Sequence, residues 1–362
     1  MKRYRQLVLA VVVLVSAWGS WAQLPSVSAL SLADTLPERL TDEEFWKLSE
    51  SLSEQNGYFQ SDNLLSNEIW YPYVIPELLS RAKRGGVYLG VGPEQNFNYI
   101  VAIRPRMVFI TDVRRGNLHS QLMYKALFEL SADRADFFGK LFTKARPKGL
   151  TAKSTAADIV NAYWDPSVLT MGQDVYKANL KAIQDHLTKT RKLPLGEEDL
   201  KGIDYVYYNF YWYGPAITYS SSSGRGGGAN MVTYGDLMIA TDSQGVLRSY
   251  LASEESFKVL KDLEERNLIV PVVGDFAGTK ALRAVGNYVR ERGATITAFY
   301  LSNVEQYLSR NGVWPAFCAN VATMPLDPQS TFIRSQQGFN GGPGGGLVNS
   351  LGSMQAETAN CR

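Results

Sequence analysis

Two separate parts of the chain, at about 77–131 and 250–335, alternate short apolar runs with amphipathic segments. The run MVFIT at 107–111 is continuously apolar, as expected of a strand buried on both faces of a parallel sheet. The next segment, 116–130, places its leucines on one helical face. This alternation predicts an α/β fold. We expect both parts to form one Rossmann-like, doubly wound sheet within a domain at 77–335.

The strands expected in this sheet are short apolar runs with turn residues at their ends. They lie at 87–90, 107–111, 268–274, 295–301 and 331–334, with helices between them. Pro271 interrupts the third run, and proline cannot donate a hydrogen bond within a sheet. We therefore expect that strand to lie at an edge or to contain a bulge.

An insertion at about 133–250 separates the two parts. It has helical periodicity as far as residue 200, whereas the run YVYYNFYWY at 205–213 has the aromatic composition of a strand. Another short strand is expected at 236–241. The serine- and glycine-rich run at 220–230 predicts a flexible loop.

The start of the chain has the layout of a cleaved secretory signal peptide. Residues 1–22 contain a basic stretch, an apolar run and the small residues Ser20 and Ala22 at the expected cleavage positions. The alternative is a membrane anchor, which needs about 20 apolar residues, more than the unbroken run at 7–15 provides. We expect cleavage after Ala22, export to the periplasm or the medium, and no stable membrane insertion.

The segments that flank the predicted domain differ from it in composition. Residues 23–76 predict an extended lead-in and a helix that begins at Thr41, where Glu44 completes a capping box. Residues 336–362 are rich in glycine and predict a disordered tail.

Composition and charge narrow the classes of function. The 362 residues include 37 basic and 35 acidic side chains, a net charge of +2, whereas nucleic-acid binding needs a basic excess, so no nucleic-acid partner is expected. Two histidines and two cysteines cannot supply the common zinc sites, and no calcium-loop pattern is present, so no metal site is expected. Cys318 and Cys361 would form one disulfide or remain free thiols in an oxidising compartment.

The strongest motif is the run VYLGVGPEQN at 87–96, in which a strand leads through a Gly-x-Gly turn into a helix. Gly90 and Gly92 would let backbone amides approach a ligand, and Asn96 lies at the helix start, which favours polar or negative groups. Asp112 ends the next strand, where a carboxylate can accept hydrogen bonds from ribose hydroxyls. The pattern indicates a site for a small-molecule ligand of nucleoside type, with another small ligand or a purely structural turn as alternatives.

This motif resembles the first motif of class I S-adenosylmethionine-dependent methyltransferases, and Asp112 matches their ribose-binding acid. The later run VVGDF is similar to their third motif, which maps the contact with adenine onto Asp275. The run FYLSN, ending at Asn303, falls where the fourth motif places substrate-facing polar residues. The resemblance covers about 77–131 and 268–310 and implies a methyltransferase-type fold, S-adenosylmethionine as cofactor and group transfer.

Two positions depart from that family's first motif. Tyr88 stands where its acid would be, and Glu94 stands where its third glycine would be. These differences favour the alternative function, a non-catalytic binding or interaction protein that keeps the fold. The runs YLGVGPEQN and VVGDFAG are also similar to an uncharacterised exported bacterial family with no assigned reaction. We take Asn303 and Tyr234 as candidates to face a substrate, and the spacing assigns no catalytic residue.

Overall fold

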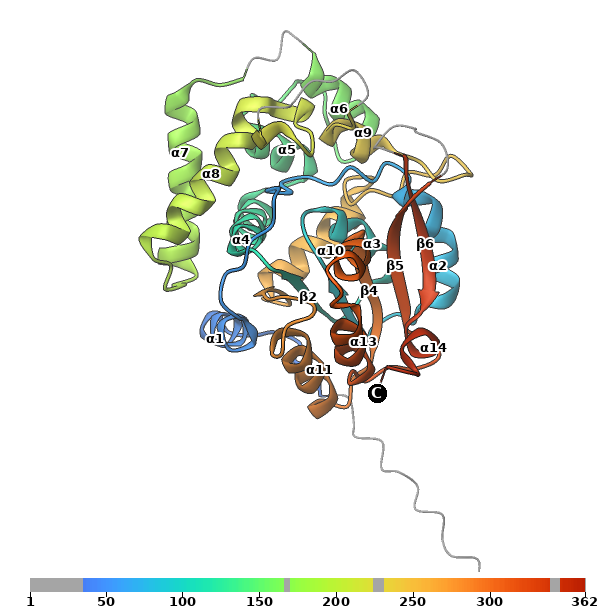
Figure 1. Ribbon diagram of the computed structural model, residues 1–362. Coiled ribbons are helices and arrows are strands. Elements are labelled where there is room, and N and C mark those ends of the chain that lie inside the picture. Colours follow the sequence, from blue (N-terminus) through green and yellow to red (C-terminus); the bar gives the residue numbers. More distant parts are fainter. Residues whose placement is uncertain (1–34, 166–169, 224–230, 339–345, 362) are drawn as a thin grey trace, which may run out of the picture. The chain divides into compact units, whose positions relative to one another are not determined.

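The computed structural model describes residues 35–165, 170–223, 231–338 and 346–361 (Figure 1). The predicted signal peptide, with its cleavage site at Ala22, lies outside these residues, as does most of the loop predicted at 220–230.

The strands of the described residues form one six-stranded sheet in the order β3-β2-β1-β4-β5-β6. Its strands are β1 Val87–Gly90, β2 Met107–Asp112, β3 Ile269–Val273, β4 Ile296–Ser302, β5 Thr331–Gln337 and β6 Leu347–Ser353. Neighbouring strands from β3 to β5 are parallel, whereas β6 is antiparallel to β5. The predicted α/β class is confirmed, and the strand order is compatible with a Rossmann-like fold.

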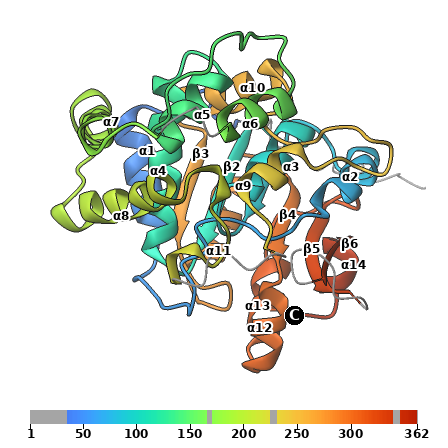
Figure 2. The ribbon, with the colours of Figure 1, turned by 90° about the horizontal axis from the view of Figure 1, so that it is seen from above.

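The helices in the described residues are α1 Asp42–Leu52, η1 Tyr71–Val74, α2 Ile75–Arg81, α3 Gln95–Ile103, α4 Arg115–Leu130, α5 Arg134–Phe142, α6 Ala156–Trp164, α7 Gln173–Asp185, η2 His186–Thr190, α8 Glu197–Tyr213, η3 Gly214–Ala216, η4 Ser221–Ser223, α9 Tyr234–Ile239, α10 Glu254–Glu265, α11 Ala281–Glu291, α12 Val304–Arg310, α13 Trp314–Ala322 and α14 Met354–Thr358. Figure 2 shows α3 and α10 on one side of the sheet and α11, α12 and α13 on the other. Every residue of β1, β2 and β3 is buried, as two covered faces require.

The edge position predicted for the strand that contains Pro271 is confirmed, because β3 is the outermost strand on its side. The end of α1 and the residues after it cover the unpaired backbone groups of β3. The Ser49 hydroxyl donates to the carbonyl oxygen of Pro271 at 2.5 Å, and the backbone N–H of Glu54 donates to that of Val273 at 2.7 Å. These backbone groups at the edge of the sheet therefore have hydrogen-bond partners without another strand.

The strand predicted at 205–213 is wrong, because these residues form the C-terminal half of α8. Glu197, Glu198 and Asp199 place acidic groups in its first turn, which the helix dipole favours. Its residues Val206 and Phe210, one turn apart, are buried where α8 packs against α4 and α5. In an almost uniformly aromatic run, the periods of a strand and of a helix both fit, and tertiary packing selects the helix.

The strand predicted at 236–241 is also wrong. Residues Tyr234–Ile239 form α9, which begins after a capping box between Thr233 and Asp236. The hydroxyl of Thr233 accepts the backbone N–H of Asp236 at 3.1 Å, and the Asp236 carboxylate accepts the N–H of Thr233 at 2.9 Å. This local pair satisfies helix N-terminal groups that a strand would leave to a neighbour.

The glycine-rich tail predicted at 336–362 is ordered in part. Residues Leu347–Ser353 form β6, which pairs with β5 along its whole length, and α14 follows directly. A disulfide joins Cys318 on α13 to Cys361 after α14, with Cα atoms 5.4 Å apart, so the predicted pairing is confirmed. Most glycines of the predicted tail fall within or beside residues 339–345, which lie outside the described residues, and few fall within β6.

Replacing both Cys318 and Cys361 with alanine is expected to lower the free energy of unfolding by about 2 kcal/mol, because the cross-link restricts a long loop of the unfolded chain. Urea unfolding of the oxidised protein and of the double variant measures the difference. Peptide mapping without reductant should recover the two cysteines in one linked pair. Two free thiols in the protein purified without reductant would contradict the pairing.

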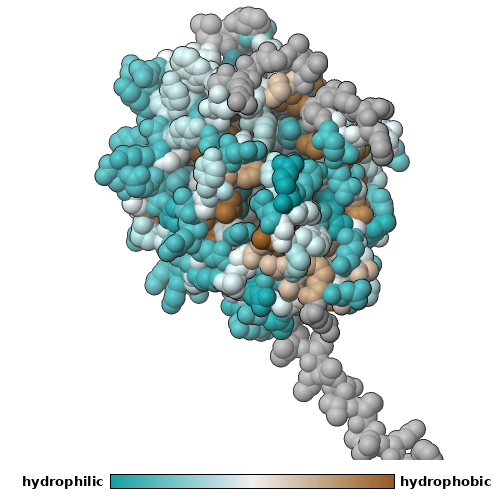
Figure 3. Space-filling view, in the orientation of Figure 1, coloured by the Kyte–Doolittle hydropathy of each residue, from teal (hydrophilic) through white to brown (hydrophobic). Residues whose placement is uncertain are grey.

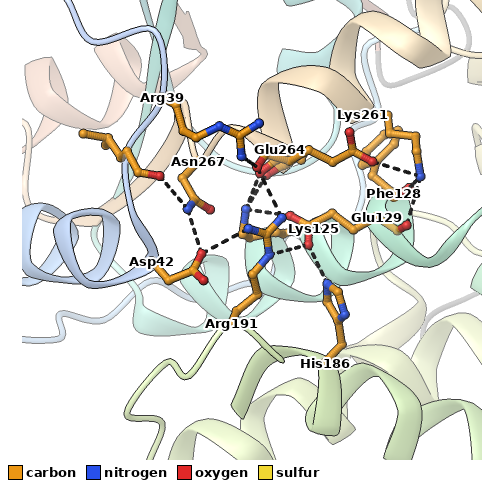
Figure 4. A network of polar contacts seen from close by, with 12 residues as sticks. Arg39, Asp42, Lys125, Phe128, Glu129, His186, Arg191, Lys261, Glu264 and Asn267 are labelled. Atoms are coloured by element: carbon orange, nitrogen blue, oxygen red, sulfur yellow. Dashed lines mark hydrogen bonds and ion pairs between the residues drawn. The ribbon is translucent and has the colours of Figure 1, made fainter. Parts of the chain in front are cut away.

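A buried network of charged groups joins α4 to α10 and to the segment after α7 (Figure 4). The Lys125 ammonium lies 2.8 Å from a carboxylate oxygen of Glu129 and donates to the backbone carbonyl of Glu264 at 2.5 Å. The other oxygen of Glu129 accepts from Arg191 at 2.7 Å and contacts His186 at 2.5 Å. The Lys125 and Glu129 side chains are nearly inaccessible to water, so their charges depend on these partners.

The molecular face in Figure 3 is mainly hydrophilic, with hydrophobic residues in small separate patches. Across the described ranges, no helix combines the length and the apolar character needed to cross a membrane.

Candidate functional site

A cavity of about 520 Å³ lies at the carboxyl ends of the parallel strands. In chain order, β2 and β3 extend the sheet on one side of β1, whereas β4 and β5 extend it on the other side. The direction in which strands are added therefore reverses between β1 and β4. Such a switch point is where open α/β sheets bind ligands. The segment from α1 to η1, which passes α4 in Figure 1, contributes a wall of the cavity with residues between Tyr58 and Glu68.

Four of the predicted site residues border this one cavity: Gly92, Asp112, Asp275 and Asn303. They follow or end β1, β2, β3 and β4, respectively. Gly92 has a φ of 74°, and a Cβ built on it meets nothing within 4 Å, so its backbone faces open space. Each of the strands β1 to β4 therefore places one predicted residue at the same opening.

Gly90 and Asn96 do not border the cavity, and their predicted roles as ligand contacts are corrected. The Asn96 amide donates to the carbonyl oxygens of Val91 and Pro93 at 2.9 and 2.8 Å, and its oxygen accepts from the Tyr88 hydroxyl at 3.0 Å. A Cβ on Gly90 would lie 1.8 Å from that amide oxygen. A glycine is therefore needed at position 90 because the Asn96 side chain, which stabilises the turn, leaves no room for a Cβ, and not because a ligand approaches there.

The carboxylate of Asp112 is held by Arg114. One oxygen accepts the backbone N–H and the Nε of Arg114 at 2.9 and 3.1 Å, and the other accepts from Nη2 at 3.1 Å. Nη1 of Arg114 also donates to the carbonyl oxygens of Ser61 and Asp62. Since each carboxylate oxygen can accept two hydrogen bonds, Asp112 retains one acceptor position for a ligand. Both side chains are buried, so this carboxylate also stabilises the fold, unlike a solvated strand-end acid.

Asp275 and Asn303 are less constrained. One Asp275 oxygen accepts the backbone N–H of Ala277 at 2.9 Å, and the residue is exposed at the cavity rim. Asn303 occupies the N-cap position of α12 and makes no side-chain capping bond. Both remain available to a bound molecule.

Tyr234 lies away from the cavity, which contradicts its predicted role in facing a substrate. It is fully buried on α9, and its hydroxyl contacts that of Tyr250 at 2.5 Å. Its ring packs against Phe138, Phe142 and Phe210. Tyr234 is a core residue of the insertion.

The cavity wall also contains Glu68, which no sequence motif indicated, and Tyr300 and Ser302 from the run FYLSN. Glu68 is 1% exposed and accepts hydrogen bonds from the hydroxyls of Tyr300 at 2.7 Å and Ser302 at 2.6 Å. Burial raises its pKa, and these hydrogen bonds partly oppose the rise. Ser302 has a φ of 50°, an unfavourable backbone for serine of the kind that gathers at functional sites.

A second buried carboxyl group, Glu94, lies behind this wall. It accepts the backbone N–H of Ser66 at 3.2 Å, while its other oxygen has no hydrogen-bond partner. Burial, aided by the charge of Glu68, raises its pKa to about 8. Glu94 therefore carries a proton at neutral pH.

A smaller cavity of about 270 Å³ borders His119 on α4. His119 Nε2 lies 2.9 Å from Asp199 Oδ1, and Arg115 donates to the same oxygen at 2.7 Å. Burial lowers the pKa of His119, whose Nδ1 side lies against Gly202. The described residues that border this cavity include no serine, threonine, cysteine or lysine, and in the described part of the chain no three ligand-type side chains gather as a metal site would require.

No curated protein matches the sequence. Two segments, 60–197 and 229–342, match the family described as a domain of unknown function, DUF7790. They contain β1 to β5 and most of the residues that border the larger cavity. Since the match covers more than half of the chain, this protein belongs to the DUF7790 family.

Proposed function

We propose that this exported protein has a methyltransferase-type fold and binds a nucleoside-type ligand in the larger cavity, with S-adenosylmethionine as the candidate cofactor of a group transfer. The observation that carries the proposal is the convergence of Gly92, Asp112, Asp275 and Asn303 on one opening. These residues come from distant parts of the sequence, and unrelated loop residues would not need to meet. The cavity volume is in the range of small-ligand sites.

The residues present fit the nucleoside half of such a cofactor better than the rest of it. Gly92 leaves space for a ribose beside the turn, and Asp112 offers one acceptor to a hydroxyl. Tyr88, at the acid position of the methyltransferase motif, is buried and bonded to Asn96, so it supplies no carboxylate. Bound S-adenosylmethionine would supply an activated methyl group, and we derive no transfer step from this site.

Binding without catalysis is the second candidate function. It is favoured by the Arg114 guanidinium, which already neutralises Asp112 in this structure, and by the non-acidic Tyr88. Ligand preference separates the two functions. A transferase should bind S-adenosylmethionine and S-adenosylhomocysteine more tightly than adenosine, whereas a nucleoside-binding protein should show no such preference.

Replacing Gly92 with asparagine is expected to weaken nucleoside binding by about tenfold or more. Asparagine tolerates a positive φ better than most residues, and its side chain would enter the open space beside the cavity. Isothermal titration calorimetry with adenosine, S-adenosylmethionine and S-adenosylhomocysteine measures the change.

Gly245→Asn is the matched control, because Gly245 has a φ of 75°, has equally open surroundings and does not border the cavity. It should carry the same backbone cost and bind within about twofold of the wild type. If none of the three compounds binds the wild type at millimolar concentration, the nucleoside site is wrong. Equal weakening by both substitutions would show a general effect of strain.

A further inference from the structure

Glu68 places a carboxyl group in the cavity wall without a cationic partner among the described residues. Its three hydrogen-bond donors are all neutral: the hydroxyls of Tyr300 and Ser302 and the amide of Asn349, the last at 2.7 Å. None of the ion pairs among the described residues includes it, and no cation contributes to its electrostatic environment. A buried carboxylate without a cation is costly, so this arrangement is most stable when a positive charge arrives.

The described residues that border the cavity include more acidic than basic groups. Three of them have carboxyl groups, Glu68, Asp112 and Asp275, and one has a guanidinium group, Arg114. That guanidinium is 3.1 Å from Asp112 and neutralises it. The remaining charge disfavours a phosphate or another anion and favours a cation.

Hydrogen-bonding capacity points to the same kind of ligand. One oxygen of Glu68 accepts two hydrogen bonds, whereas the other accepts only that of Asn349, so one acceptor position remains. No described residue supplies a donor at that position, so it is open to a bound ligand. Aromatic rings at the cavity wall, including those of Tyr300 and Tyr307, add faces that attract cations.

We propose that Glu68 binds a cationic nitrogen of the ligand, such as a protonated primary amine, and that the cavity rejects ligands whose matching group is neutral or anionic. This inference uses the cavity of the proposed function but does not require a nucleoside. In this proposal Glu68 selects ligands by their charge, whereas Gly92 and Asp112 contact the nucleoside.

Calorimetry with two matched pairs of compounds tests the assignment. The first pair, 5′-amino-5′-deoxyadenosine and adenosine, differs by an amine on a nucleoside. The second pair, tyramine and 4-ethylphenol, differs by an amine without a nucleoside. The wild type should bind the amine of at least one pair about ten- to a hundredfold more tightly than its neutral partner, as a charge-assisted hydrogen bond provides.

Glu68→Gln should abolish that preference while leaving the neutral compounds within about twofold. The variant should fold, because the Asn349 amide oxygen has no partner and, after rotation of the amide, can accept from the new glutamine. Glu255→Gln, which removes an exposed carboxylate that does not border the cavity, is the control and should keep the preference. Circular dichroism and the melting temperature establish folding of both variants.

Each result decides between the two proposals. If the nucleoside pair binds equally well and Glu68→Gln changes nothing, the cation assignment is overturned while the nucleoside site stands. If both nucleosides fail but tyramine binds in a manner that depends on Glu68, the cation assignment stands and the proposed nucleoside ligand falls. Absence of any amine preference in both pairs overturns the assignment.

Discussion

Replacing Lys125 with methionine is expected to lower the free energy of unfolding by about 3–5 kcal/mol. Its ammonium is 2.8 Å from Glu129 and 3.8 Å from a carboxylate oxygen of Glu264, and all three side chains are no more than 3% exposed (Figure 4). Methionine fills a similar volume but leaves both acidic groups and the backbone carbonyl of Glu264 without this cation. Urea unfolding at neutral pH measures the loss.

The matched control is Lys181→Met, which removes the same kind of ion pair, four residues along a helix, from the surface. Lys181 and Asp185 are 69% and 37% exposed, so water replaces the lost contact and the melting temperature should hardly change. A loss for Lys125→Met as small as that of the control would contradict the tight burial of this network.

The double substitution Lys125→Met with Glu264→Gln distinguishes charge from packing. Burial raises the pKa of Glu264 to about 8, whereas Glu129, despite its burial, is brought to about 2 by His186, Lys125 and Arg191. Glu264 is therefore neutral at pH 7, and Lys125 is matched mainly by Glu129. The double variant should recover little of the lost stability, because the unpaired charge left behind belongs to Glu129.

The sheet was predictable because its strands are buried on both faces and so read as continuous apolar runs. The run at 107–111 is an example of such burial, whereas the edge position of Pro271 follows from the hydrogen bond that proline cannot donate. The run at 205–213 was misread because nearly every residue in it is apolar, which leaves no contrast between inner and outer faces. Only contact with α4 and α5 identifies the helix.

The site was predictable where a residue follows a strand. The strand-end rule brings Gly92, Asp112, Asp275 and Asn303 to one edge before any fold is known. Glu68 could not be placed in this way, because it comes from an irregular segment before β1 whose path depends on tertiary contacts. A lone acid in an otherwise apolar and aromatic stretch, NEIWYPYV, was the available signal.

Local sequence was also a poor guide to which polar groups are free. Asp112 and Arg114 are two residues apart, and their pairing leaves only part of the carboxylate for a ligand. Glu94, which departs from the methyltransferase motif, is a buried acid rather than a tolerated surface change. A carboxyl group in that position gives the fold a dependence on pH that a glycine would not.

Glu94→Gln is expected to become more stable than the wild type as the pH rises from about 5 to 8, by roughly 1.4 kcal/mol per pH unit. Burial raises the pKa of Glu94 to about 8 from its ordinary 4.5, so the folded protein holds a proton that the unfolded chain releases. The stability that this proton contributes is complete below pH 4.5 and is lost as the pH approaches 8. Glutamine resembles the protonated acid, keeps the acceptor for the N–H of Ser66 and does not titrate, so the two proteins should be nearly equal at pH 5. Urea unfolding at pH 5, 6, 7 and 8 gives the difference, from which the titration of Glu264 cancels because both proteins contain it.

Glu255→Gln is the control, since Glu255 is exposed and its hydrogen bond to Arg104 lowers its pKa. The difference in stability between this variant and the wild type should not grow with pH in this range. Parallel stability profiles for Glu94→Gln and the wild type would show that Glu94 titrates at its ordinary pKa, which would contradict this prediction.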